Sequence, residues 1–327
     1  MVPEGKIKMP ELRKDYVTED YVIIATERSK RPSDFQHKKE KKSPKSKCPF
    51  CPENENMVPK PIVDEIKDNK GKWMIRVIKN KFPAVKPKGN PEIQTHNKYY
   101  AFADAYGQHE VVIETPVHGK ELEDLPLEHI EKVIEMYIKR LKEISKDKKI
   151  KYAALFKNRG KDAGASISHS HSQIIAYNLF PTKIQKKLDA IKKYDKCPHC
   201  EIIESEKNSD RRCYENKDFV AFTPYASSFP FELWYLPKRH LASITEMTGE
   251  EIKSLAEMLK QSLNKLDKIE YPAFNIDFYN IPGENFHFHI ALSPRLATRA
   301  GFEHITDTII NAESPEDAAK FYRGETE

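Results

Sequence analysis

Residues 156–177 read FKNRGKDAGASISHSHSQIIAY, a turn rich in small residues followed by an alternating segment. Alternate side chains of a β-strand point to the same face, so we expect His169, His171 and Gln173 to line one side of a strand. The glycine, alanine and serine residues before them allow the backbone to approach a ligand closely. Three polar side chains on one face beside such a loop favour a site for phosphate chemistry over a buried core.

The same order of elements occurs twice along the chain. Each half has a Cys-Pro-x-Cys pair, two strands of which the second is followed by a proline and a histidine, an amphipathic helix, a further strand and a His-x-His strand. Hydrophobic periodicity predicts strands over 73–78, 110–114 and 152–156 around a helix over 125–144, and strands over 219–222, 231–236, 273–279 and 286–290 around a helix over 248–269. The shared order indicates an internal duplication. Outside the repeat, we expect a strand over 21–26 and a lysine-rich helix over 181–196.

The duplication predicts an α+β fold of two similar halves, each a mostly antiparallel sheet with helices on one face. A chain of 327 residues is long enough for two such halves, which we place at 1–180 and 181–327. The first half would hold the chemical site and the second would act as a scaffold that lines the substrate pocket.

The composition points to an ordinary globular protein, with 39% apolar and 32% charged residues. No segment reaches the roughly 18 consecutive apolar residues of a membrane helix. The N-terminus lacks the apolar segment of a secretion signal, so we expect a cytoplasmic location and no membrane partner. Much of the net charge of +5 lies in residues 37–47, HKKEKKSPKSK. This run is typical of a solvated loop, although a basic run can also bind nucleic acid.

Both cysteine pairs have the spacing of metal ligands, and a chain without a secretion signal favours metal ligation over disulfides. Each half adds an isolated histidine and the first histidine of its His-x-His strand. Two cysteines and two histidines complete a tetrahedral zinc set, and a set of four protein ligands is structural rather than catalytic. We therefore predict two structural zinc ions, one held by Cys48, Cys51, His118 and His169, and one held by Cys197, Cys200, His240 and His287.

His171 remains free for chemistry if His169 binds a metal. A neutral imidazole can attack phosphorus and carry a nucleotidyl group covalently, provided that a hydrogen bond to its other nitrogen fixes the tautomer. Gln173 can donate to a phosphoryl oxygen without acting as an acid or base. The loop before the strand, with Ser166, offers further donors, and Arg28 and Arg31 offer charge for phosphate. In the second half His289 is followed by Ala291 instead of glutamine, so that half has lost the site.

These residues resemble the active-site strand of the galactose-1-phosphate uridylyltransferase family, in the histidine-triad superfamily. The resemblance covers nearly the whole chain, and it makes both halves histidine-triad-like. It rests on Arg28 and Arg31, both Cys-x-x-Cys pairs, Asn80 and Phe82, His118, Asn158, the His-x-His-x-Gln strand, Tyr225, Pro237 to His240, the second His-x-His and Gly301 to Glu303.

The resemblance implies a ping-pong transfer. His171 would attack the α-phosphate of a nucleotide sugar and release a sugar 1-phosphate, and a phosphate-bearing acceptor would then take the nucleotidyl group. Gln173 would mark a transferase, because the hydrolytic branches have a third histidine there. By the same resemblance Asn80, Phe82, Asn158 and Ser166 match nucleotide-contacting positions, Glu303 lies in a sugar-contacting segment, and the protein forms homodimers with composite sites.

Three hypotheses follow for the function. Ser170, Ser172 and Lys81 depart from the usual uridylyltransferase pattern, and the second cysteine pair, the sequence GASISHSHSQ and the C-terminal segment also resemble plant ADP-glucose phosphorylases. The first reading is transfer of UMP from UDP-glucose to galactose 1-phosphate, and the second is adenylyl transfer from ADP-glucose to phosphate. The third is a non-enzymatic zinc module that binds nucleic acid through 37–47, which leaves the His-x-His-x-Gln strand unexplained.

Overall fold

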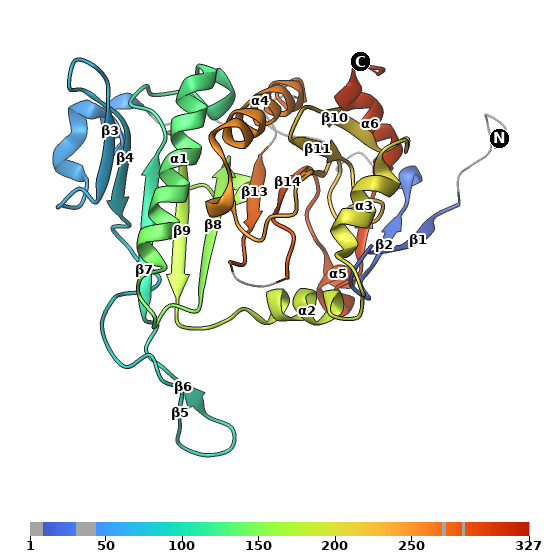
Figure 1. The fold of residues 1–327 in the computed structure, drawn as a ribbon, viewed down its shortest axis with the longest axis horizontal. Helices are drawn as coiled ribbons and strands as arrows, with labels where there is room; N and C mark the ends of the chain where they lie inside the picture. Colours follow the sequence, from blue (N-terminus) through green and yellow to red (C-terminus); the bar gives the residue numbers. More distant parts are fainter. Residues whose placement is uncertain (1–8, 31–43, 270–272, 283–284, 327) are drawn as a thin grey trace.

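Ten strands form one antiparallel sheet in the computed structural model, which describes residues 9–30, 44–269, 273–282 and 285–326 (Figure 1). The strand order is β10-β11-β12-β14-β13-β8-β9-β7-β4-β3. From one edge to the other these strands are β10 (Arg212–Glu215), β11 (Phe219–Phe222), β12 (Leu233–Pro237), β14 (His289–Pro294), β13 (Phe274–Tyr279), β8 (Tyr152–Arg159), β9 (His171–Tyr177), β7 (Gly107–Ile113), β4 (Trp73–Lys79) and β3 (Asp64–Lys67). The expected α+β class with antiparallel pairing is confirmed, and the sheets expected for the two halves join into one.

The two halves of the sheet have matching strand orders when each is followed from its outer edge to the centre. The order β3-β4-β7-β9-β8 on one side matches β10-β11-β12-β14-β13 on the other, and β8 pairs with β13 at the centre. Phe274 lies opposite Arg159 and Phe278 lies opposite Leu155 in this central ladder. The predicted repeat is therefore visible as two half-sheets that share a seam of backbone hydrogen bonds.

Two long helices, α1 (Leu127–Ile144) and α4 (Gly249–Leu266), pack against each other across one face of the sheet (Figure 1). Their apolar stripes pack against alternate side chains of the strands, such as Ile75, Ile174 and Ile276, in one continuous core. Thr248 caps α4 as predicted, because its hydroxyl accepts from the Glu251 N–H while Glu251 accepts from the Thr248 N–H. Within the described residues, no helix is long and apolar enough to cross a membrane.

The opposite face differs between the two halves. In the second half it is covered by α2 (Thr182–Ile191) and α3 (Pro198–Glu206), which pack on Phe222 and Trp234 in a separate core. The helix predicted over 181–196 is present as α2 but ends five residues early, because the positions packed in this core stop at Ile191, and a second helix that was not predicted begins at Pro198. Helices thus cover both faces of the second half, whereas the first half carries the Cys48–Cys51 segment on this face.

Both His-x-His strands begin one histidine later than predicted. β9 begins at His171 and β14 at His289, so His169 and His287 precede their strands. The predicted strand over 231–236 begins only at Leu233, because Phe231 adopts a positive φ of 57° in the turn before it. The remaining predicted helices and strands agree with the structure to within a few residues at their ends.

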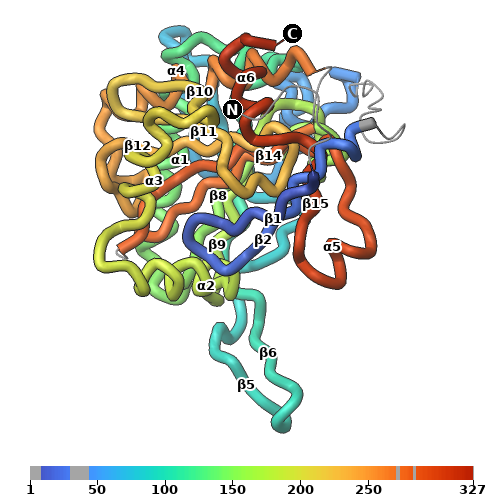
Figure 2. Tube along the Cα trace, turned by 90° about the vertical axis from the view of Figure 1, so that its right-hand side faces the viewer, coloured from blue at the N-terminus to red at the C-terminus, as the bar shows by residue number. Residues whose placement is uncertain are grey.

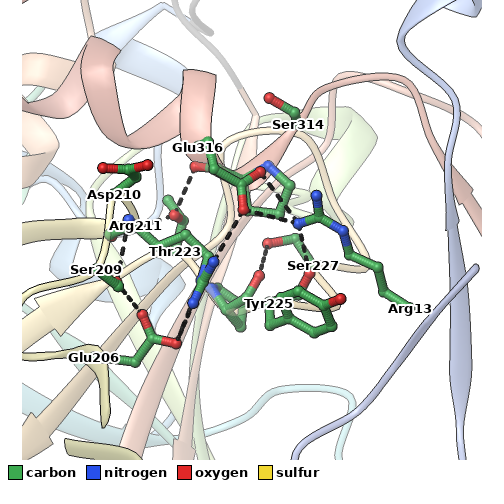
Figure 3. A network of polar contacts seen from close by, with 12 residues as sticks. Arg13, Glu206, Ser209, Asp210, Arg211, Thr223, Tyr225, Ser227, Ser314 and Glu316 are labelled. Atoms are coloured by element: carbon green, nitrogen blue, oxygen red, sulfur yellow. Dashed lines mark hydrogen bonds and ion pairs between the residues drawn. The ribbon is translucent and has the colours of Figure 1, made fainter. Parts of the chain in front are cut away.

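The N-terminal segment belongs spatially to the second half. β1 (Glu11–Lys14) and β2 (Tyr21–Ile24) form a small sheet with β15 (Ile309–Asn311), beside α5 (Gly301–Thr306) (Figure 2). Figure 3 shows how ion pairs hold it there: Glu316 of α6 (Pro315–Arg323) binds Arg13 at 2.9 Å and Arg211 at 3.0 Å. Arg211 also binds Glu206 of α3 at 2.8 Å. The guanidinium groups of Arg13 and Arg211 both lie over the ring of Tyr225.

A hairpin arm, built on β5 (Gln94–Thr95) and β6 (Ala101–Phe102), projects from the first half (Figures 1 and 2). Its apolar side chains are largely exposed, among them Ile93, Tyr99 and Tyr100.

Candidate active site and two Cys2His2 clusters

The first predicted metal set comes together beside β9. Its four ligand atoms all lie within 4.8 Å of one another. His169 Nδ1 is 3.5 Å from Cys48 Sγ and 3.7 Å from Cys51 Sγ, and His118 Nδ1 is 3.3 Å from Cys51 Sγ. The other ring nitrogen of His169 donates to the Thr115 carbonyl oxygen at 2.7 Å, which leaves Nδ1 unprotonated and available to a cation.

The second set repeats this geometry in the other half. His287 Nδ1 is 3.7 Å from Cys197 Sγ and 3.4 Å from Cys200 Sγ, and His240 Nδ1 is 3.6 Å from Cys200 Sγ. His287 Nε2 donates to the Pro237 carbonyl oxygen at 2.9 Å, as His169 does to Thr115.

Both sets fit a tetrahedral ion. Zinc–sulfur bonds of about 2.3 Å and zinc–nitrogen bonds of about 2.1 Å separate sulfur and nitrogen ligands by about 3.6 Å. The observed separations lie around this value in both halves. In the protein alone, burial raises the pKa of the Cys51 and Cys200 thiols to about 12, so a bound cation would be needed to favour the thiolates. The structure therefore holds two Cys2His2 groups that can bind metal ions.

His171 lies next to the first cluster in a fixed tautomer. Its Nδ1 donates to the carbonyl oxygen of His169 at 2.8 Å, so its Nε2 carries a free lone pair. The side chain is 6% exposed, and burial lowers its pKa to about 4. The edge of the Phe50 ring covers one side of the imidazole, at 5.3 Å between ring centres. The result is a neutral imidazole with one available nitrogen.

A buried polar network supports β9 from the helix side. Glu114 accepts hydrogen bonds from Ser170, Ser172 and Tyr137, and an ion pair of 2.6 Å joins it to Lys157. Burial alone would raise the pKa of Glu114, but the charge of Lys157 and the two serine hydroxyls outweigh it and lower the pKa to about 2. The network satisfies the charges behind the strand and fixes the backbone that carries His171.

Gln173 lies two residues along β9, on the same face as His171. Its Oε1 is 2.9 Å from Nε2 of His109 on β7 and 3.5 Å from Nδ2 of Asn80. Asn80 follows β4 and is itself held by the Phe82 N–H, which donates to its Oδ1 at 2.8 Å. The structure thus brings the predicted residues Asn80 and Gln173 together, and it adds His109.

The other predicted nucleotide-contacting residues lie on a neighbouring strand or in exposed loops. Asn158 lies on β8, next to β9, and its Oδ1 accepts from Asn275 at 2.7 Å across the seam. Phe82 is 83% exposed, and Ser166 is exposed in the loop before β9. An exposed aromatic ring and hydroxyl near the end of β4 and the start of β9 are accessible to a ligand.

Two predicted contacts are not joined to the site within this chain. No hydrogen bond or ion pair of the described residues links Arg28 or Glu303 to His171 or Gln173. Glu303 accepts from the N–H of Ala300 and so caps its own helix, α5, which lies away from β9 in both views (Figures 1 and 2). Arg31 falls outside the residues that the structure describes.

The comparisons with known proteins agree with this geometry. A family model described as galactose-1-phosphate uridyl transferase, N-terminal domain, matches residues 1–181. A galactose-1-phosphate uridylyltransferase of Thermotoga maritima is 32% identical over 98% of this chain and 99% of its own length. The chain belongs to the galactose-1-phosphate uridylyltransferase family. It is therefore a member of a family of nucleotidyl-transferring enzymes.

Family membership leaves the substrate open, because a second branch of the family is equally close. An ADP-glucose phosphorylase of Arabidopsis thaliana is 35% identical over 96% of this chain and 92% of its own length. The crystal structure of an Arabidopsis thaliana ADP-glucose phosphorylase with bound ADP-glucose matches this fold with a TM-score of 0.83 and 32% identity, over 96% of this chain and 99% of the other. A model of a domain of unknown function, DUF4921, also matches residues 123–321.

Sequence reasoning did not find His109, Glu114 or Lys157. Lys157 lies within the apolar strand β8 and Glu114 directly follows β7, and charges in or beside buried strands are a signal for a buried ion pair. His109 offered no such signal, because its contact with Gln173 depends on which strand lies beside β9.

Proposed function

We propose that the protein is a nucleotidyltransferase that moves UMP from UDP-glucose to galactose 1-phosphate through a covalent intermediate on His171. The observation that supports this most directly is the hydrogen bond from His171 Nδ1 to the His169 carbonyl oxygen. It leaves Nε2 as a neutral nucleophile on the same strand face as Gln173.

In the first step the Nε2 lone pair of His171 attacks the α-phosphorus of the nucleotide sugar. A phosphorus–nitrogen bond forms, the bond from the α-phosphorus to the bridging oxygen breaks, and glucose 1-phosphate leaves. In the second step a phosphate oxygen of the acceptor attacks the same phosphorus, and the phosphorus–nitrogen bond breaks. Gln173 would donate to an α-phosphoryl oxygen in both steps, and Asn80, Asn158 and Ser166 would bind the nucleotide.

We propose zinc for both Cys2His2 groups, in a structural role. The ion held by Cys48, Cys51, His118 and His169 would fix the position of His169, whose carbonyl oxygen sets the tautomer of His171. The ion held by Cys197, Cys200, His240 and His287 would do the same for the backbone before β14. Metal analysis of the purified protein, with an expected content of two zinc ions per chain, tests this assignment.

We further propose that the protein acts as a homodimer with composite sites. The separation of α5 from β9 within one chain supports this, because Glu303 could then meet the His171 site of a second copy. Mixing of inactive His171→Ala and Glu303→Gln homodimers should restore part of the activity after subunit exchange. Failure of the mixture to regain activity, with exchange verified, would contradict the composite site.

The central test is direct detection of the intermediate. Incubation with radiolabelled UDP-glucose alone should leave an acid-labile, alkali-stable label on His171, and added galactose 1-phosphate should release it as UDP-galactose. His171→Asn is the matched control, because its amide retains a similar size without the imidazole. Turnover by His171→Asn at the wild-type rate would contradict the mechanism.

Adenylyl transfer from ADP-glucose to phosphate is the second candidate. The likeness to an ADP-glucose phosphorylase solved with ADP-glucose favours it. The same labelling with ADP-glucose, and a comparison of thermal stabilisation by UMP and by AMP, discriminates between the two. The nucleic-acid reading depends on residues 37–47, of which 37–43 lie outside the described residues, and nothing in the described part of the chain favours it.

A further inference from the structure

His109 connects the catalytic strand to a fixed point of the backbone. It lies on β7, half-buried, and both of its ring nitrogens have partners. The Ala84 N–H lies 3.2 Å from His109 Nδ1, and Gln173 Oε1 lies 2.9 Å from His109 Nε2. The imidazole therefore bridges the segment after β4 and the candidate phosphoryl-binding glutamine.

The hydrogen bond with the Ala84 N–H fixes the tautomer of His109. An N–H group can only donate, so His109 Nδ1 must accept from Ala84, and the proton of the neutral ring must be on Nε2. His109 Nε2 then donates to Gln173 Oε1.

Asn80 adds a second donor to the same oxygen. Because the Phe82 N–H donates to Asn80 Oδ1, the amide nitrogen of Asn80 is directed towards Gln173 Oε1 at 3.5 Å. The Asn80 amide nitrogen and His109 Nε2 lie 3.1 Å apart, and both act as donors to the same acceptor, Gln173 Oε1. Two backbone N–H groups, at 82 and 84, thereby determine the orientation of the Gln173 amide.

This orientation has a chemical consequence. Because Oε1 of Gln173 is bound on the side of His109 and Asn80, the Gln173 NH2 group points elsewhere, and no described residue accepts from it. A flipped amide would present a carbonyl oxygen to an anionic phosphoryl group and would repel it. A glutamine can flip at little cost unless its oxygen and nitrogen have different partners.

We propose that His109 is a positioning residue for nucleotidyl transfer, which holds the Gln173 amide with its NH2 group towards the α-phosphoryl group. This inference rests on the proposed nucleotidyl transfer at His171. His109 acts through Gln173 and does not itself touch the reacting atoms.

A double-mutant cycle on formation of the nucleotidyl-histidine tests the proposal. The rate of label incorporation from UDP-glucose or ADP-glucose, whichever donor labels the wild type, is measured for His109→Leu, Gln173→Ala and the double variant. We expect His109→Leu to lower this rate about tenfold, the effect of one neutral hydrogen bond, with the donor KM changed less than about threefold. In the Gln173→Ala background the same substitution should cost less than about twofold.

Rescue separates positioning from folding. His109→Gln can still donate from its side-chain nitrogen, so it should retain activity to within about threefold. Equal losses from His109→Leu with and without Gln173 would overturn the proposal, as would full activity of His109→Leu or an NMR spectrum that shows the His109 proton on Nδ1. If the wild type forms no adduct that His171→Asn abolishes, the proposed function itself fails, and this inference fails with it.

Discussion

His171 and His289 occupy matching places in the two halves and have the same backbone support. Each follows a metal-ligand candidate by two residues, and each donates from Nδ1 to the carbonyl oxygen of that residue, at 2.8 Å for His171 and 2.9 Å for His289. Each therefore carries an unprotonated Nε2. The local geometry that prepares a nucleophile is present twice in this chain.

The difference lies in what covers each imidazole. His289 is fully buried, and the rings of His199, Tyr279 and Trp234 pack around it, with Tyr279 stacked at 4.5 Å. The Lys187 ammonium group of α2 lies over the Tyr279 ring and adds a further cover to this cluster of rings. His289 Nε2 has no hydrogen-bond partner among the described residues. Among the described residues, the one aromatic ring that packs against His171, besides its neighbours in the cluster, is Phe50, in the position where His289 has His199.

The strands also differ on the side that faces the helices. Lys157 lies opposite Ser172 across the β8–β9 ladder, whereas Phe278 lies opposite Ile290 across the β13–β14 ladder. One half uses a buried ion pair where the other uses an apolar core. The comparison teaches that the imidazole geometry follows from the repeated backbone, while accessibility and polar support distinguish the half with the proposed nucleophile from the other half.

Removal of each histidine should give the largest contrast. His171→Ala is expected to lower nucleotidyl transfer by about 10⁴-fold or more, since the nucleophile is lost. His289→Ala should leave the rate per folded molecule within about threefold, but should destabilise the protein by about 3 kcal/mol through the cavity that it creates. Labelling rates and urea denaturation measure the two effects. Comparable losses of activity in both variants would remove the distinction between the halves.

As the pH is lowered, the first half should lose stability at a higher pH than the second half. The pKa of Glu114 is about 2 in the folded protein, below its ordinary value of 4.5, so its stabilisation is present above that ordinary value and is lost as pH falls towards 2. The expected loss is about 3 kcal/mol between these pH values, roughly 10²-fold in the folding equilibrium. Hydrogen exchange measured between pH 5 and pH 3 should show faster opening of β9 than of β14. Glu114→Gln should remove most of this pH dependence, and an unchanged pH profile would show that the ion pair is not its source.

Exchange of Gln173 and its counterpart tests whether the scaffold half can regain chemistry. Gln173→Ala should lower transfer by about 10²-fold, the usual effect of losing one donor to a developing charge. Ala291→Gln places a glutamine at the matching position of β14, but it should add no activity and should cost about 1–3 kcal/mol of stability because that position is buried. The transfer rate of each variant is measured with His171 present and with His171→Ala. Formation of a nucleotidyl adduct on His289 in the Ala291→Gln protein would contradict the inference that the surrounding rings block access to His289.

The cysteine pairs should give a smaller contrast. Cys51→Ser and Cys200→Ser should each lower the metal content by one ion per chain. We expect Cys51→Ser to lower the transfer rate about tenfold or more, because the first ion supports His169, and Cys200→Ser to lower chiefly the melting temperature. Metal analysis, melting curves and labelling rates on matched samples check this. Equal effects of the two variants on the rate would assign both ions the same role.

Much of this arrangement was predictable because the signal was repeated. The spacing of the cysteines and histidines in two halves predicts both Cys2His2 groups, and alternation predicts the shared face of His171 and Gln173. The ends of the His-x-His strands were not predictable, since His169 lies against Cys48 and Cys51, which are more distant in the sequence than local patterns can show. The start of α3 was predictable from Pro198, because proline favours the first turn of a helix.

The remaining site residues depend on tertiary pairing. His109 meets Gln173 because β7 lies beside β9, and local sequence does not specify that neighbour. Arg28 follows β2, which pairs with β15 of the second half, and the order of residues in the chain does not reveal this pairing. The division of the chain at residues 180 and 181 stays a prediction, and the pairing of β1 and β2 with β15 shows that the N-terminal segment does not follow it in space.

The seam between β8 and β13 bears on the origin of the molecule. Two strands at matching positions of a repeat pair with each other in antiparallel register, which is the arrangement that a two-fold symmetric pair of identical half-chains would produce. Gene fusion would convert such an association into one polypeptide and free each copy to diverge. On this view the closed pocket around His289 is the vestige of an equal partner, retained because removing its strands would leave β8 as an open edge.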